Sequence, residues 1–232
     1  RGMRVMLLGP TGVGKERLAS CYHRHSRQHR GPYATINCAL LNQNLIYAQL
    51  FGAKKGSFTG STGDLVGLVE AAHDGTLFLD EVADMPSEVQ KALLRFLDTS
   101  GEYQRLGDPH VRRVSVQIVC ATNVALDDIE ERASRMREDL WYRLAVKVVR
   151  VPPLRERPED IGAFLHSRTM FGTGLRVGDA LSPGARELVM RDPLPGNFRD
   201  LENFVERLPP TSQPGSIDES ACAAALSEGR GE

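Results

Sequence analysis

The sequence has no long apolar run and few cysteines. None of its hydrophobic stretches approaches the about 20 residues that a membrane-spanning helix needs. Its four cysteines, Cys21, Cys38, Cys120 and Cys222, lie far apart and include no Cys-x-x-Cys pair. This spacing argues against a disulfide framework or a zinc site, and it favours reduced thiols in a cytoplasmic protein.

An excess of charge of either sign is also absent. The 29 lysines and arginines and the 30 acidic residues give a net charge of -1, so the chain as a whole has no electrostatic attraction to DNA. Any DNA contact would come from a local patch or from another part of the protein. The chain begins Arg1-Gly2, without Met or a signal peptide, so we expect it to be a piece of a longer protein. Its length of 232 residues suits one large domain, or a main domain and a small one.

The first motif that is present is a glycine-rich loop between an expected strand and an expected helix. Residues 3–8 are apolar, residues 16–22 have a helical pattern, and between them stands Gly9-Pro10-Thr11-Gly12-Val13-Gly14-Lys15. In such a loop the backbone N–H groups and the helix N-terminus surround phosphate, and the lysine reaches the terminal phosphates. Glu16 stands where the usual pattern has Ser or Thr as a Mg²⁺ ligand. We interpret the motif as a phosphate-binding loop rather than a tight structural turn.

Two later strands end in polar residues that suit the same site. Apolar residues 77–79 lead into Asp80-Glu81, and the strand expected over residues 116–121 leads into Thr122-Asn123. A strand-end Asp can hold Mg²⁺, and an adjacent Glu can orient or deprotonate the attacking water. Asn123 can bond the γ-phosphate or that water, or it can simply cap a turn. Many strands end in solvated acids, but after a phosphate loop this arrangement indicates a site that binds Mg²⁺ and activates water.

The remaining pattern predicts an α/β domain followed by a small helical one. Further strands are expected over residues 34–38 and 146–151, helices over residues 40–50, 64–72 and 86–98, and a hairpin over residues 102–114. Prolines within residues 152–158 mark a boundary, and helical segments follow over residues 161–170, 182–191 and 197–208. The basic residues 23–30 are interpreted as a solvated helix end, with nucleic-acid contact or a metal site as alternatives. We expect domains over residues 1–152 and 153–210 and a linker over residues 211–232, with a short helix within it over residues 217–226.

Residues 56–61 form a loop whose one aromatic side chain has no local packing partner. Gly56-Ser57-Phe58-Thr59-Gly60-Ser61 has flexible glycines at both ends and small hydroxyl residues around a phenylalanine, so it cannot bury that aromatic ring by itself. Taken alone, the loop would be a surface segment whose Phe58 packs back onto the core.

With these pieces in order, the chain resembles the AAA+ ATPase domain of bacterial enhancer-binding proteins, which activate the RNA polymerase that holds sigma-54. The resemblance covers nearly all of residues 3–208, and its most specific part is residues 56–61, similar to the family's Gly-Ala-Phe-Thr-Gly-Ala signature with serine at both alanine positions. It implies a P-loop AAA+ three-layer α/β domain with a five-stranded parallel sheet, followed by a helical lid. It also implies ATP and Mg²⁺ as cofactors, a hexameric or heptameric ring, sigma-54 polymerase as the partner of residues 56–61, and DNA contact through a domain outside this chain.

The resemblance further implies a role for each matching residue. In the family a Glu commonly follows the phosphate-loop lysine, so Glu16 fits the pattern. The implied roles are phosphate binding for residues 9–16, Mg²⁺ binding for Asp80, water activation for Glu81, restraint of that glutamate for Asn37, γ-phosphate sensing for Asn123, trans-acting arginine fingers for Arg137 and Arg143, and lid sensing for Arg199.

The chain departs from the family's pattern at a few positions, and other functions stay open. Tyr47-Ala48-Gln49 stands where acidic residues are usual, Leu194 replaces a common Trp, and Met136 replaces a common Phe. The alternatives are an AAA+ remodeller or unfoldase with an aromatic pore loop, and a nucleotide-gated interaction module that binds ATP without turnover.

Overall fold

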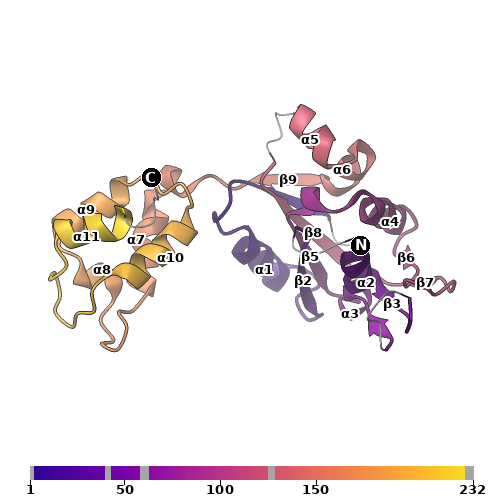
Figure 1. The fold of residues 1–232 in the computed structure, drawn as a ribbon, viewed down its shortest axis with the longest axis horizontal. Helices are drawn as coiled ribbons and strands as arrows, with labels where there is room; N and C mark the ends of the chain where they lie inside the picture. Colours follow the sequence, from indigo (N-terminus) through magenta and orange to yellow (C-terminus); the bar gives the residue numbers. More distant parts are fainter. Residues whose placement is uncertain (1–2, 40–42, 58–62, 125–128, 228–232) are drawn as a thin grey trace. The chain divides into compact units, whose positions relative to one another are not determined.

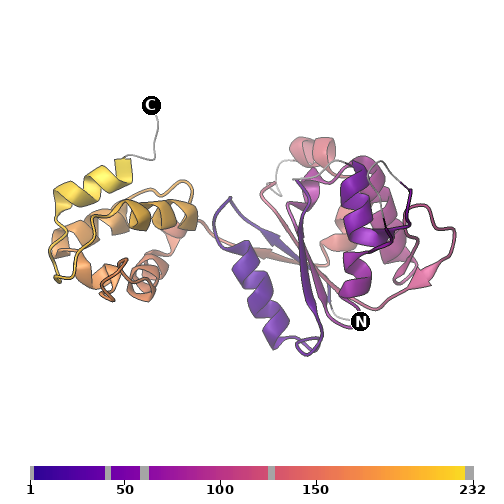
Figure 2. The same cartoon turned by 60° about the horizontal axis from the view of Figure 1, so that its bottom comes forward.

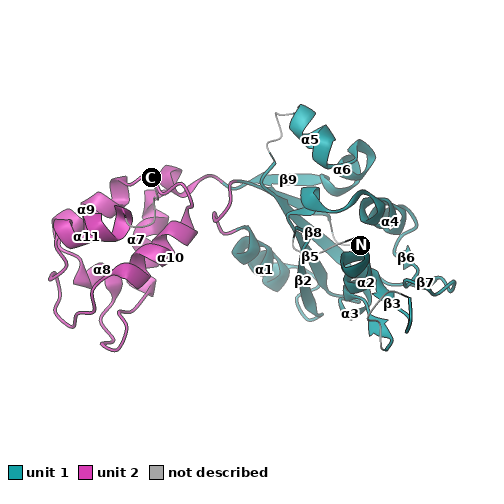
Figure 3. Cartoon of the chain, viewed as in Figure 1, with its two compact units in different colours: residues 1–9, 15–151 teal, residues 10–14, 152–232 magenta. Residues whose placement is uncertain are grey.

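The computed structural model describes residues 3–39, 43–57, 63–124 and 129–227, and it divides the chain into two compact units (Figures 1 and 3). The first unit comprises Arg1–Gly9 and Lys15–Val151, and the second comprises Pro10–Gly14 and Pro152–Glu232. Most of the glycine-rich loop is therefore grouped with the second unit. In the described residues no helix has the length and apolar character needed to cross a membrane.

The first unit is built on a sheet with the strand order β2-β5-β8-β1-β9. Its strands are β1 (Val5–Leu8), β2 (Tyr33–Asn37), β5 (Thr76–Asp80), β8 (Gln117–Thr122) and β9 (Lys147–Arg150). All neighbouring pairs are parallel. The central strands are almost continuously apolar, because a parallel sheet is covered on both faces. The five-stranded parallel sheet expected from the sequence is confirmed.

Helices cover both faces of this sheet, which gives the unit three layers (Figures 1 and 2). On one face α1 (Lys15–His25) packs over a cluster that includes Leu7, Phe78 and Val119. On the other face the alternate side chains, such as Met6 and Ile118, belong to the larger core cluster. The helices of that face are α2 (Gln43–Phe51), α3 (Leu68–Ala71), α4 (Ser87–Asp98) and α6 (Glu138–Leu144), with α5 (Ile129–Arg135) leading into α6. The alternation follows from the period of two in a strand.

A short ribbon replaces the start of the helix that was predicted over residues 64–72. β3 (Gly52–Ala53) pairs antiparallel with β4 (Leu65–Val66), and α3 begins only at Leu68. At Gly67 a Cβ atom would lie 2.3 Å from the Phe51 carbonyl carbon, so close backbone packing fixes this crossing. The prediction of a helix from residue 64 was wrong because two-residue strands leave almost no periodic signal. A second ribbon, β6 (Glu102–Tyr103) with β7 (Arg112–Arg113), confirms the predicted hairpin.

The second unit is helical and has its own core. Its helices are α7 (Pro158–Ser167), α8 (Val177–Ala180), α9 (Pro183–Arg191), α10 (Phe198–Arg207) and α11 (Glu219–Ser227). Ser182 caps α9 by accepting a hydrogen bond from the Ala185 N–H at 3.1 Å. The short helix expected over residues 217–226 corresponds to α11; Ile217 pairs with Leu181, and Cys222 of α11 is fully buried. The apolar face of α11 therefore completes this core.

Candidate active site

Three predicted site residues meet at the carboxyl edge of the parallel sheet. Lys15, the first residue of α1, is buried, and its Nζ donates to the Gly9 carbonyl at 2.9 Å and lies 3.7 Å from Glu81 Oε1. The other carboxylate oxygen, Glu81 Oε2, accepts a hydrogen bond from the Asn123 N–H at 3.2 Å. These residues follow β1, β5 and β8, which are neighbours in the sheet. The topology thus brings together groups that stand far apart in the sequence.

Glu81 has an unusual backbone conformation at the end of β5. Its φ of 48° lies in the left-handed region, which is strained for a residue with a Cβ, and its N–H donates to Asp80 Oδ1 at 3.0 Å. Burial raises the pKa of the Glu81 carboxyl group, and the nearby Lys15 ammonium partly opposes that rise. A carboxylate with a raised pKa suits acceptance of a proton near neutral pH.

Asp80 lies beside Asn37 in the sheet. The two residues are paired in the β2–β5 register, and the Cys38 N–H donates to the Asp80 carbonyl at 2.9 Å. The Asn37 side chain accepts a hydrogen bond from the Ala39 N–H at 2.9 Å, and among the described contacts none joins it to Glu81. Its predicted restraint of Glu81 stays a prediction. The Asp80 carboxylate fits Mg²⁺, which typically takes one or two protein carboxylates together with phosphate oxygens.

The part of the glycine-rich loop in the second unit is held by its carbonyl groups. The Thr11, Gly12 and Val13 carbonyls accept hydrogen bonds from Asn197 Nδ2 at 2.9 Å, the Phe198 N–H at 3.0 Å and the Arg157 guanidinium at 2.6 Å. Gly12 has a φ of 76°, and a Cβ atom there would lie 2.1 Å from the Gly196 carbonyl oxygen. Only glycine fits this position.

Asn197 is a site residue that the sequence analysis treated only as part of a helix start. It is 2% exposed and has a φ of 58° and a ψ of -128°, a conformation that non-glycine residues rarely adopt. Its Oδ1 accepts a hydrogen bond from the Leu154 N–H at 2.7 Å, and its Nδ2 donates to Thr11. Arg199, the predicted lid sensor, is an exposed residue of the first turn of α10. Only the positive φ and burial, which the sequence does not display, identify Asn197 as the residue that holds the loop.

The two predicted arginine fingers flank α6. Arg137 precedes the helix and binds the Asp139 carboxylate at 2.7 and 3.0 Å, whereas Arg143 near its end contacts Asp98 Oδ1 at 2.8 Å. All four side chains are well exposed, and exposed pairs of this kind contribute little to stability. Either guanidinium can therefore exchange its carboxylate for another anion at small cost.

The β3–β4 ribbon carries the loop over residues 56–61, of which the structure describes Gly56 and Ser57. Ser57 Oγ donates to the Lys54 carbonyl at 2.6 Å, and the Lys55 N–H donates to Asp64 Oδ1 at 2.9 Å. Phe58, Thr59, Gly60 and Ser61 lie outside the described residues. The loop predicted to contact a partner is therefore seen only at its base.

A charged cluster that the sequence analysis missed supports this base. The Glu70 carboxylate accepts hydrogen bonds from the Arg105 guanidinium at 2.8 and 3.0 Å and from the Tyr103 hydroxyl at 2.7 Å. The Tyr103 hydroxyl, followed by Arg105, lowers the pKa of Glu70. Next to Arg105, the Leu106 N–H and carbonyl bond Gly52 and Lys54 at 2.9 Å each. The hairpin over residues 102–113 is thereby fastened to the β3–β4 ribbon.

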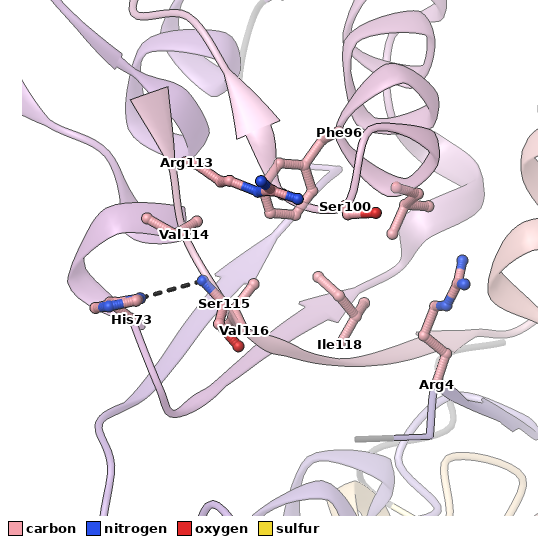
Figure 4. A pocket seen from close by; sticks show the side chains of 11 residues that line it. Arg4, His73, Phe96, Ser100, Arg113, Val114, Ser115, Val116 and Ile118 are labelled. Carbon is pink, nitrogen blue, oxygen red and sulfur yellow. Dashed lines mark hydrogen bonds between the residues drawn. The ribbon is translucent and has the colours of Figure 1, made fainter. Parts of the chain in front are cut away.

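A separate pocket of about 360 Å³ lies at the opposite edge of the sheet (Figure 4). Its walls include Arg4, Phe96, Arg113 and Ile118, close to the amino ends of β1 and β8. His73 on its rim accepts a hydrogen bond from the Ser115 N–H at 3.1 Å. Since phosphate groups bind at the carboxyl edge of such sheets, this pocket is not the phosphate site.

The parallel sheet with a glycine-rich loop after β1 and acids after β5, followed by a helical unit, defines a P-loop domain of the AAA+ class. The family model described as the sigma-54 interaction domain matches residues 1–150. The chain therefore belongs to the sigma-54 interaction domain family.

Similar proteins include transcription regulators and a solved structure. The chain is 42% identical over 210 residues to the phenol regulator MopR of Acinetobacter guillouiae, covering 88% of this chain and 36% of that protein. It is 45% identical over 209 residues to the nitric oxide reductase transcription regulator NorR1 of Cupriavidus necator, covering 88% and 40%. The crystal structure of NtrX from Brucella abortus in complex with ADP matches with a TM-score of 0.82 and 32% identity, covering 97% of this chain and 50% of that one. The chain thus spans less than half the length of these curated relatives.

Proposed function

We propose that this chain binds ATP with Mg²⁺, hydrolyses it in a ring of identical subunits, and uses the turnover to remodel the sigma-54 RNA polymerase closed complex. The observation that carries the proposal is the contact of Glu81 with both Lys15 and Asn123 at the sheet edge, at 3.7 and 3.2 Å. Membership of the sigma-54 interaction domain family supports the choice of partner. The ADP and ATP complexes of the similar NtrX structures support the choice of nucleotide.

The chemistry is divided among few side chains. Lys15 and the N–H groups of residues 9–15 bind the phosphates, and Asp80 holds Mg²⁺, which when bound neutralises charge on the phosphate oxygens. Glu81 orients the attacking water and accepts its proton, a role to which its raised pKa is suited. Asn123 stands next to Glu81 and contacts the γ-phosphate or the water.

The ring would complete each site with arginine from the neighbouring subunit. In a head-to-tail contact, one surface of each chain meets a different surface of the next chain. Arg137 and Arg143 of one subunit would lie on the first surface and reach the nucleotide bound at the second. Stabilisation of the transition-state charge by such an arginine is worth about 10³–10⁵ in rate. The exposure of both side chains supports this role.

The output is assigned to residues 56–61. Phe58 and Thr59 would contact sigma-54, with the glycines Gly56 and Gly60 and the serines Ser57 and Ser61 on either side of them. The β3–β4 ribbon and its hydrogen bonds to Leu106 anchor the loop to the first unit, so a movement of the ribbon would move the loop with it.

Phosphate release measured against protein concentration tests the enzymatic part. We expect specific activity to rise cooperatively with concentration and to disappear in Glu81→Gln. Glu187→Gln is the matched control, because Glu187 is exposed on α9 of the second unit and forms an ion pair with the neighbouring Arg191. Activity that persists in Glu81→Gln, or that is independent of concentration in the unaltered chain, contradicts the proposal.

Capture of sigma-54 in the presence of ADP and aluminium fluoride tests the partner. Phe58→Ala is expected to keep most of the ATPase activity and lose sigma-54 binding. Phe171→Ala is the matched control, since Phe171 of the second unit is 94% exposed. Binding and activation that survive in Phe58→Ala would show that the loop is not the contact.

A further inference from the structure

Gln90 is a buried polar side chain in the first turn of α4. It is 3% exposed, and its neighbours on α4, Val89 and Leu93, belong to the larger core cluster of the first unit. Its Nε2 donates to the Met85 carbonyl at 2.8 Å and to the Arg135 carbonyl at 2.9 Å, and its Oε1 accepts a hydrogen bond from the Arg137 N–H at 2.8 Å. A buried amide is costly unless it is paired, and here both donors and the acceptor are used.

These bonds join two segments that matter for the proposed reaction. Met85 ends the short 3₁₀ turn Val82–Asp84, which begins directly after Glu81. Arg135 ends α5, and Arg137 precedes the first residue of α6. The side chain of Gln90 therefore connects the segment that follows Glu81 to the segment that carries a predicted arginine finger.

A second link joins the same two segments. The Arg135 guanidinium forms an ion pair with the Asp84 carboxylate, and it also contacts Glu131 at 3.1 Å. Between Arg135 and Arg137 the side chain of Met136 is buried in the core. The backbone around Arg137 is thus held by the Arg135–Asp84 ion pair, by the buried Met136 side chain and by Gln90, and of these Gln90 bonds the N–H of Arg137 itself.

The bond to the Arg137 N–H holds the backbone from which the arginine side chain extends. Arg137 precedes α6 with an extended backbone, at φ -60° and ψ 134°, so its N–H lies before the helical bonds begin. Without Gln90 Oε1 nothing else in the described contacts accepts from that N–H. A shift of about 1 Å in a group that stabilises a transition state costs roughly 100-fold in rate.

We propose that Gln90 is a positioning residue that holds Arg137 of one subunit in the geometry needed to reach the nucleotide of the next subunit. This inference rests on the proposed function. Gln90 touches no nucleotide itself and acts through Arg137, with the Glu81 segment as the fixed reference.

Gln90→Met is the first variant, because methionine has a similar shape and forms none of the three hydrogen bonds. We expect kcat for ATP to fall roughly 100-fold while KM stays within about twofold, since the phosphate loop is untouched. Gln117→Met is the matched control: Gln117 is also buried, at 2% exposure, but it bonds Tyr22 instead. It is expected to lower the unfolding temperature without lowering kcat. An unchanged kcat in Gln90→Met overturns the proposal.

Mixed rings separate a positioning role from a structural one. Arg137→Ala subunits keep an intact site and lack the arginine, whereas Lys15→Ala subunits lack the site and keep the arginine, so their mixture should release phosphate. Adding Gln90→Met to the Lys15→Ala subunit should abolish this rescue, and adding Gln117→Met should not. Gln90→Met subunits mixed with Lys15→Ala subunits should be rescued, because their own site is intact.

Each outcome has a definite meaning. Rescue by the subunit that carries both Lys15→Ala and Gln90→Met, or no rescue of Gln90→Met by Lys15→Ala, overturns the role of Gln90. No release from the mixture of Arg137→Ala with Lys15→Ala overturns the trans-acting arginine itself, and that arm contains no change at Gln90. If Gln90→Met does not fold, Gln90→Leu takes its place in every arm, because leucine also forms none of the three hydrogen bonds, and the outcomes keep the same meaning.

Discussion

Replacement of Asn197 tests how the second unit holds the glycine-rich loop. Asn197→Ala removes the acceptor of the Leu154 N–H and the donor to the Thr11 carbonyl while keeping a Cβ atom at a φ of 58°. Asn197→Gly removes the same two hydrogen bonds but relieves the backbone. The pair of variants therefore separates the hydrogen bonds from the strain.

The expected loss of stability follows from these contacts. The Leu154 N–H is buried, and leaving it unpaired costs about 2 kcal/mol, whereas the Thr11 carbonyl belongs to an exposed residue that water can reach and costs about 1 kcal/mol. Asn197→Ala should thus lower the free energy of unfolding of the second unit by about 3 kcal/mol. Asn197→Gly should recover about 1 kcal/mol of that loss, because glycine adopts a positive φ without strain.

Urea denaturation followed by circular dichroism measures both values. Asn203→Ala is the control, because Asn203 lies in the middle of α10 and is partly exposed, so it should change stability by no more than about 0.5 kcal/mol. A loss below about 1 kcal/mol in Asn197→Ala, or an alanine variant more stable than the glycine variant, would refute this reasoning.

Three further predictions concern the glycine-rich loop and two carboxyl groups. Gly12→Ala should lower the unfolding temperature of the second unit far more than Gly56→Ala does. Both glycines have a positive φ, but only a Cβ atom at Gly12 would meet a backbone oxygen, that of Gly196, at 2.1 Å. Equal shifts in the two variants would contradict this contact. The pKa of the Glu70 carboxyl group is lowered, so its contribution to stability should be present above its ordinary pKa and be lost as the pH falls below about 4.3. The unfolding midpoints of Glu70→Gln and of the unaltered chain should therefore differ at pH 7 and converge in acid. A difference that does not change with pH would show that the charge of Glu70 does not stabilise the fold. The pKa of the Glu81 carboxyl group is raised, so its contribution to stability is present below its ordinary pKa and is lost as the pH rises through the raised pKa. The kcat for ATP hydrolysis should increase over the same range, because only the ionised carboxylate can accept a proton. A kcat that does not change with pH would argue against Glu81 as the base.

Much of the fold and half of the site could be predicted from local patterns. Apolar runs that end in Gly9 or in Asp80-Glu81 predict parallel strands, because strands covered on both faces need no polar alternation. The glycine spacing before Lys15 predicts a phosphate loop, because it sets the backbone conformation within a few residues. These features depend on neighbours in the chain, so the sequence displays them directly.

Other features depend on contacts between distant residues. The β3–β4 ribbon has two residues in each strand, which is too short for a periodic signal, and the packing of α11 against the second unit's core depends on contacts that a local pattern does not display. Gln90 and Asn197 are ordinary polar residues in the sequence. Their importance comes from burial among specific backbone groups and, for Asn197, from a positive φ.

The chemical groups of the protein can be read from local patterns: a phosphate loop, an acidic pair after an apolar strand, arginines beside a helix and the loop over residues 56–61. Their meeting points come from the fold, in which Lys15, Glu81 and Asn123 meet at one edge, Gln90 binds the Arg137 N–H, and Asn197 holds Thr11. The physical reason is that composition and local spacing fix the residue types, whereas strand order and side-chain burial fix which of them come within hydrogen-bond distance.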